Sequence, residues 1–222
     1  MFVGALQIMS MLDPQELLRS GGYLLLFFIV FAESGLLVGF FLPGDSLLFT
    51  AGVLATGGAL SQRLGIEFNI VVLCAGCFAA AVVGDQFGYL IGNKAGPKLF
   101  NRPDSRLFKR EYVDKAEMFF EDYGAKAIIL ARFVPIVRTF VPTVAGVSRM
   151  HYQRFLRFNI IGGLLWGVGI CLLGYFFGQI DFVEENLEIT ILGVVLISSL
   201  PIAFEIMKSR KAAKADSVES RP

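Results

Sequence analysis

The 222-residue chain is 55% hydrophobic and only 18% charged, with a net charge of +1 and a mean hydropathy of +0.65. An average soluble domain carries about 25% charged residues, and here the apolar residues are gathered into long runs. The composition excludes an ordinary soluble domain and predicts an all-α integral membrane protein. The net charge points to no particular partner, and we expect no nucleic-acid binding.

The apolar runs divide the chain into one membrane domain with two short ends. Residues 1–20 are of mixed polarity, and we expect an interfacial segment there. No polar linker interrupts residues 21–207, which predicts a single transmembrane domain, and residues 208–222 form a basic tail. The runs are 21–60 (broken by LPGD at 42–45), 68–92, 125–148, 155–180 and 187–207.

Three cysteines, Cys74, Cys77 and Cys171, lie in apolar runs. The motif CAGC at 74–77 resembles a redox or zinc-binding pair, but no second pair of ligands accompanies it. On a helix the motif places two small residues one turn apart, so we interpret it as a packing feature. No metal site and no cofactor are predicted.

Basic and acidic residues are unevenly distributed between the connections. The 93–117 connection holds seven Lys/Arg and the tail holds five, whereas 181–188 holds four acidic residues and neither Lys nor Arg. The positive-inside rule places the first two in the cytoplasm and the third outside. We therefore expect a multi-pass protein of the cytoplasmic (inner) membrane with a cytoplasmic C-terminus.

The 125–148 run begins and ends beside cytoplasmic basic clusters, so it must enter the membrane and return. Two prolines, Pro135 and Pro142, suit a broken hairpin better than a straight span. Such a backbone is tolerated in a membrane only where it is buried in protein or lines a wet cavity. We predict a re-entrant hairpin at about 126–148, estimated from these breaks in the run.

The first apolar run resembles the second hairpin. Glu33 precedes Phe-Leu-Pro (41–43) by eight residues, as Arg132 precedes Phe-Val-Pro (140–142), and an Ala-Gly pair follows each. Two opposed re-entrant hairpins, at about 33–58 and 126–148, predict a helical bundle of the inverted-repeat, transporter-like kind. The residues given a structural role in these hairpins are Pro43, Gly44, Pro135, Pro142 and Gly146.

Four ionisable residues lie in the predicted hairpins: Glu33, Asp45, Arg132 and Arg138. Intramembrane charges are costly and indicate function. Planar guanidinium groups suit a bidentate grip on phosphate, so the two arginines are predicted to bind phosphate. A carboxylate that loses its arginine partner tends to take up a proton, which predicts proton coupling by the two acids. The alternative is that each charge only pins a hairpin.

Gly84, Gly88 and Gly92 recur at four-residue steps, which predicts close packing of one face of the 68–92 helix. Asp85 lies beside that face, and we expect it to cap or anchor a hairpin. Further along, residues 110–123 have the spacing of an amphipathic helix on the cytoplasmic surface.

Four stretches of the chain, within roughly residues 15–180, resemble the DedA family, also described as the SNARE-associated Golgi protein or VTT-domain superfamily. They are FAESGLLVGFFLPGDSLLFTAG (31–52), GDQFGYLIGNKAG (84–96), YGAKAIILARFVPIVRTFVPTVAG (123–146) and the boundary at 150–155. In that family, acids matching Glu33 and Asp45 and arginines matching Arg132 and Arg138 are regarded as essential. The resemblance implies lipid handling: bacterial members are associated with returning undecaprenyl phosphate across the membrane, with the proton motive force and with envelope integrity, and eukaryotic relatives scramble phospholipids.

The sequence therefore predicts a lipid transporter or flippase, whose partners are protons and a lipid phosphate, either undecaprenyl phosphate or a phospholipid. An enzyme is disfavoured because His151 is the single histidine and no ligand or nucleophile cluster accompanies it. A proton or small-ion antiporter would use the same carboxylates, although two arginines favour an anionic ligand. A membrane assembly protein without transport activity is the third alternative.

Overall fold

The computed structural model describes residues 14–36, 42–100, 128–129, 132, 135–180, 182–183, 186, 189–190 and 193, leaving out the side chains of 95–100 and 135–136. The described elements are α2 (Pro14–Gly35), α3 (Gly44–Leu54), α4 (Ala59–Leu64), α5 (Ile70–Phe100), α8 (Pro135–Val147), α9 (Tyr152–Gly163), the π-helix η2 (Leu164–Val168) and α10 (Gly169–Phe177). Across these ranges the protein is helical, without a strand.

The chain divides into two units, Met1–Leu187 and Glu188–Pro222. In the second unit only residues 189, 190 and 193 are described, and all three are helical. The predicted span at 187–207 therefore lies almost wholly outside the described residues. The same holds for the basic tail and for the predicted amphipathic helix at 110–123.

Within the described ranges, three helical segments are long and apolar enough to cross a membrane: Pro14–Gly35, Ile70–Lys94 and Tyr152–Phe177. The second and third correspond to the predicted spans at 68–92 and 155–180. Helix α5 continues beyond the predicted end, to Phe100. Large apolar side chains on these segments are exposed, as lipid contact requires, among them Leu24 (84%) and Val71 (71%). The protein is a multi-pass helical membrane protein.

The short helices are the elements that the predicted hairpins require. Helices α3 and α8 have 11 and 13 residues, and at 1.5 Å per residue they are about 16 and 20 Å long, less than the roughly 30 Å of hydrocarbon. Helix α2 bends at Gly22, whose φ is 51°, so its straight part after the bend is also short. Neither α3 nor α8 can cross a bilayer alone. Their re-entrant course and the inverted repeat stay predictions.

The two prolines of the second predicted hairpin occupy different kinds of position. Pro135 is the first residue of α8 and Pro142 lies inside it, so the helix is not interrupted at Pro142. A proline at the first position leaves no helical bond unmade. An interior proline deprives only the carbonyl four residues earlier, and packed neighbours make this tolerable in membrane helices. Pro43, which directly precedes α3, is therefore matched in position by Pro135 and not by Pro142.

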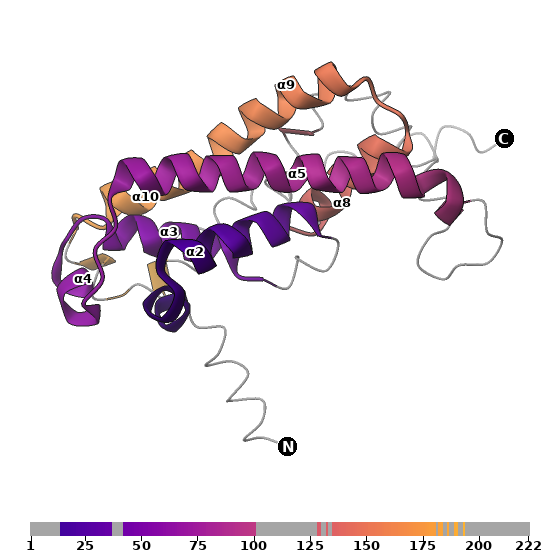
Figure 1. Ribbon diagram of the computed structural model, residues 1–222. Helices are drawn as coiled ribbons and strands as arrows, with labels where there is room; N and C mark the ends of the chain where they lie inside the picture. The colour runs from indigo at the N-terminus through magenta and orange to yellow at the C-terminus, as the bar shows by residue number, and fades with distance from the viewer. Residues whose placement is uncertain are drawn as a thin grey trace, which may run out of the picture. The chain divides into compact units, whose positions relative to one another are not determined.

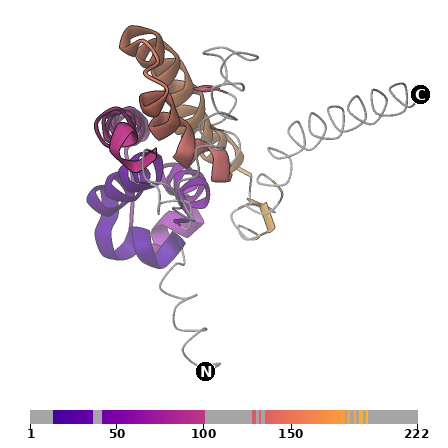
Figure 2. The same cartoon turned by 90° about the vertical axis from the view of Figure 1, so that its right-hand side faces the viewer.

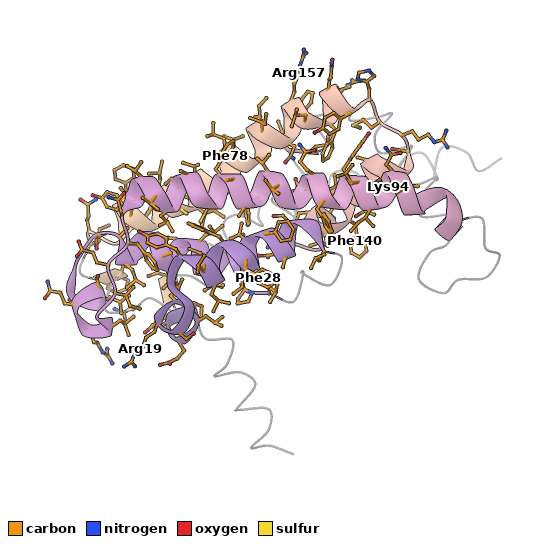
Figure 3. The ribbon with its side chains drawn as sticks, in the orientation of Figure 1. Arg19, Phe28, Phe78, Lys94, Phe140 and Arg157 are labelled. Atoms are coloured by element: carbon orange, nitrogen blue, oxygen red, sulfur yellow. The ribbon has the colours of Figure 1, made fainter. Side chains whose placement is uncertain are left out.

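Helix α5 organises the first unit by packing against α2, α8 and α9, while α3 packs against α10. Figure 1 shows α5 running between α9 on one side and α2 on the other, and Figure 2 shows the same arrangement nearly end-on. In Figure 3, Lys94 on α5 and Arg157 on α9 lie toward the same end of these helices. The assignment of both residues to one basic side of the membrane stays a prediction.

The glycine face of α5 is where these helices come closest. A Cβ at Gly84 would stand 2.6 Å from the carbonyl oxygen of Phe31 in α2. At Gly92 it would overlap the backbone of Thr143 in α8, and at Gly88 it would press on Pro142. Backbones can approach this closely only where side chains are absent. The predicted close packing of this face is confirmed.

We expect Gly84→Ala to lower the melting temperature of the purified protein, because the added methyl meets backbone atoms that cannot rotate away. Overpacking costs about 1–3 kcal/mol, of which the better helix propensity of alanine returns about 1 kcal/mol. Gly169→Ala is the matched control, since nothing lies within 4 Å of a Cβ there. Equal melting temperatures for the two variants would contradict the close α2–α5 contact.

Candidate functional site

Arg138 joins three helices through two carboxylates. It lies in the first turn of α8, and its Nη2 forms an ion pair with Oε1 of Glu33, in the last turn of α2. Its Nη1 donates a hydrogen bond of 2.7 Å to Oδ1 of Asp45, in the first turn of α3. Glu33 is fully buried and Arg138 is 8% exposed, whereas the Asp45 side chain is 29% exposed. Asp45 is therefore the member of this cluster with the best access to water.

The start of α3 is shaped to receive the Glu33 carboxylate. Pro43 immediately precedes α3 and Gly44 is its first residue. A Cβ at Gly44 would overlap the carboxylate of Glu33, so only a glycine leaves room there. The unpaired N–H groups of a helix start favour negative charge, which suits both Glu33 and Asp45. The glycine thus lets two acids share one helix start and one arginine.

Arg132 has a separate set of partners. Its Nη2 forms an ion pair with Oδ2 of Asp85 on α5 and donates a hydrogen bond of 2.6 Å to Oδ1 of Asn159 on α9. The amide of Asn159 donates in turn to the carbonyl of Val82 at 3.1 Å, which orients the amide oxygen toward Arg132. Gly162 makes room for the arginine, because a Cβ there would stand 2.7 Å from Cδ of Arg132.

Trp166 connects the two arginine clusters. Its Nε1 donates a hydrogen bond of 2.7 Å to Oδ1 of Asp45. The guanidinium carbons of Arg138 and Arg132 lie 4.8 and 6.0 Å from the centre of its ring, within the range of a cation–π interaction. Trp166 is 2% exposed and belongs to the π-helix η2, and single π-helical turns of this kind are frequent at functional sites.

Each arginine also has one buried donor that is not used. The Nε atoms of Arg132 and Arg138 are buried and have no hydrogen-bond partner among the described residues. An arginine carries five N–H donors in a fixed fork, and a buried donor without a partner is costly. Each guanidinium group can therefore still donate a hydrogen bond to an anion.

The structure describes the position of each predicted site residue, with the side chain of Pro135 left out. Glu33, Asp45 and Arg138 meet directly, and Arg132 joins them through Trp166. Glu33 and Asp45 both pair with Arg138, whereas Arg132 pairs with Asp85. Of the structural residues, Pro43 directly precedes α3, Gly44 is the first residue of α3, Pro135 is the first residue of α8, and Pro142 and Gly146 lie within α8.

Sequence reasoning missed three residues of the site: Asn159, Gly162 and Trp166. Asn159 is the one amide in the 155–177 stretch and Trp166 is the one tryptophan of the chain. A polar side chain in an apolar span needs a hydrogen-bond partner, and this signal could have found both residues. Gly162 carries no such signal, because its role is to leave space for a side chain from another segment.

The chain matches the VTT domain over residues 42–176, a range that includes Asp45, Asp85, both arginines and Trp166. No solved structure matches the chain.

Curated relatives match over most of the chain. It is 48% identical to Protein DedA of Escherichia coli K12 over 191 residues, covering 86% of this chain and 84% of that protein. An uncharacterized membrane protein of Mycobacterium leprae is 50% identical over 78% of this chain and 74% of its own length. The inner membrane protein YqjA of Escherichia coli K12 is 36% identical over 71% of this chain and 68% of its own length. Because the VTT domain match covers more than half of the chain and these relatives are 36–50% identical to it, the chain belongs to the DedA family of membrane proteins.

Proposed function

We propose that the protein is a proton-coupled transporter, or flippase, for a lipid that carries a phosphate group. The observation that carries the proposal is the pair of buried arginines beside one indole ring, each with an Nε donor that no described residue uses. Permanent positive charge is expensive in a membrane and is retained where it binds something. A phosphate group accepts several hydrogen bonds from planar guanidinium forks, so its chemistry matches the donors present.

The carboxylates supply a route to proton coupling. When a phosphate takes the donors of Arg138, Glu33 and Asp45 lose the positive charge that balances them. A buried carboxylate without a partner favours its neutral, protonated form. Protons therefore enter as the anion binds and leave as the anion departs. Asp45, whose side chain is 29% exposed, is the first acid of this cluster that water reaches.

This chemistry requires no bond to be made or broken, and we propose that the protein is not an enzyme. His151, the single histidine of the chain, is exposed in the position just before α9 and does not belong to the buried cluster of the candidate site. We further propose that the protein resides in the cytoplasmic membrane with its C-terminus inside, as the lysine and arginine distribution predicts. A reporter fused after Pro222 that is active only outside the cytoplasm would overturn that orientation.

The test is reconstitution of the full chain into liposomes that contain a fluorescent phospholipid or a labelled polyprenyl phosphate. We expect labelled lipid to move between leaflets, and a proton gradient to increase the rate. Liposomes that contain the Arg138→Lys variant are the control for leakage and nonspecific flip-flop. Ion flux without lipid movement would instead favour a proton or small-ion antiporter, for which the buried Glu33 is suited. Neither activity would favour a membrane assembly protein.

A further inference from the structure

The candidate site holds more acids than its arginines can balance. Among the described residues it contains two guanidinium groups and three carboxylates, of Glu33, Asp45 and Asp85. Glu33 and Asp45 share Arg138, whereas Asp85 forms an ion pair with Arg132. Asp85 is 3% exposed, so its charge depends on Arg132 and not on solvent.

Arg132 does not depend on Asp85 in the same way. Its Nη2 also donates to Oδ1 of Asn159 at 2.6 Å, and the Asn159 amide is held by the Val82 carbonyl. This neutral partner stays in place when Asp85 changes its charge. Nε of Arg132 is unused among the described residues. The guanidinium can therefore exchange a carboxylate for another anion and remain in position.

We propose that Asp85 competes with the phosphate group for Arg132 and takes up a proton when the phosphate binds. The inference rests on the proposed function and adds a third proton-accepting residue to it. The ion pair between Arg132 and Asp85 breaks, an N–H of Arg132 donates to a phosphate oxygen, and one proton from water binds the Asp85 carboxylate. The negative charge that Asp85 loses offsets one negative charge brought by the phosphate.

The other charged groups around this exchange are contributed by the helices packed against α5. They are Glu33 from α2, Asp45 from α3 and Arg138 from α8, while α9 contributes the uncharged Asn159. On α5 itself, the hydroxyl of Tyr89 donates to the carbonyl of Met150 at 2.6 Å and is engaged elsewhere. When Arg132 binds a ligand instead, Asp85 therefore loses the cation that balances its negative charge most directly.

The experiment measures binding of short-chain phosphatidic acid to the purified full chain by calorimetry, at neutral and at mildly alkaline pH. The affinity of the unmodified protein should fall as the pH rises, by about tenfold per pH unit for each proton taken up. Asp85→Asn removes the competitor and keeps the shape. We expect this variant to bind more tightly at alkaline pH and to lose up to about tenfold per pH unit of the dependence.

The double variant Asp85→Asn/Asn159→Asp controls for misplacement of Arg132. It returns a carboxylate to a second position beside the same Nη2 of Arg132, and we expect the original pH dependence to return with it. Inorganic phosphate, tested on the same proteins, separates recognition of the headgroup from recognition of the whole lipid.

Three results would overturn the inference. Asp85→Asn could bind with unchanged affinity and unchanged pH dependence. The binding of Asp85→Asn could also be weakened and not recover in the double variant, or neither variant could be obtained in folded form. In both cases the role of Asp85 would be only to hold Arg132 in place. By contrast, an unmodified protein that binds no phosphatidic acid at either pH would contradict the proposed function itself.

Discussion

Replacing Arg138 by lysine is expected to reduce lipid-phosphate binding and transport by about 10- to 100-fold, while the protein still reaches the membrane. The guanidinium contacts Glu33 and Asp45 through different nitrogens and lies 4.8 Å from the Trp166 ring centre. A lysine keeps the charge but has a single ammonium without the planar fork. Loss of one charge-assisted hydrogen bond costs about 1.5–3 kcal/mol, which corresponds to the stated range.

The measurement is lipid-phosphate affinity of purified variants, together with transport in liposomes. Arg157→Lys is the matched control, because this arginine is exposed on α9 (Figure 3) and has no role in the site. Arg132→Lys should resemble Arg138→Lys if both guanidinium groups contact the phosphate. Unchanged affinity in both site variants would mean that the arginines are part of the scaffold only.

Neutralising the two acids beside Arg138 should weaken the dependence of the transport rate on the proton gradient. We expect Glu33→Gln and Asp45→Asn each to reduce the acceleration by a gradient, because an amide cannot bind and release a proton in place of the carboxylate. Both substitutions keep the shape of the side chain, and the protein should still be found in the membrane. Each variant should lose a large part of the gradient-dependent rate, and the part that remains is carried by the other two acids of the site.

The check is the rate of lipid movement in liposomes with and without an imposed proton gradient. Glu67→Gln, which changes an exposed glutamate outside the site, controls for the change of one charge. The acids are not the coupling groups if both variants keep a full response to the gradient. Loss of all transport at every pH would instead indicate that the carboxylates are needed to hold Arg138 in position.

The helical membrane class, two of the spans and the four charges of the site were predictable from local patterns. Apolar runs of sufficient length report a membrane span directly. Glu33, Asp45, Arg132 and Arg138 could be recognised because each is an ionisable group placed among apolar residues. The spacing of Gly84, Gly88 and Gly92 likewise predicted a closely packed face, since a four-residue step keeps residues on one side of a helix.

The continuation of α8 through Pro142 could not be predicted from the sequence, which indicated a break there. A proline in the sequence shows that one helical hydrogen bond is lost, but the helix can continue where neighbouring segments support it. Pro142 lies beside Gly88 of α5, and such support is not visible in the local sequence. The same limit applies to Gly44 and Gly162, whose absent side chains make space for residues on other helices.

The sequence by itself determined that this is a membrane protein of helices with buried charges of both signs. Only the tertiary structure decided which acid meets which arginine. The pairs Arg132–Asp85 and Arg138–Asp45 join residues 47 and 93 positions apart, and the Trp166–Asp45 hydrogen bond joins residues 121 positions apart. Periodicity and motif spacing report neighbours along one helix, whereas these contacts depend on how α3, α5, α8 and η2 pack together. That packing gives Arg132 its own carboxylate and brings Trp166 close to both arginines.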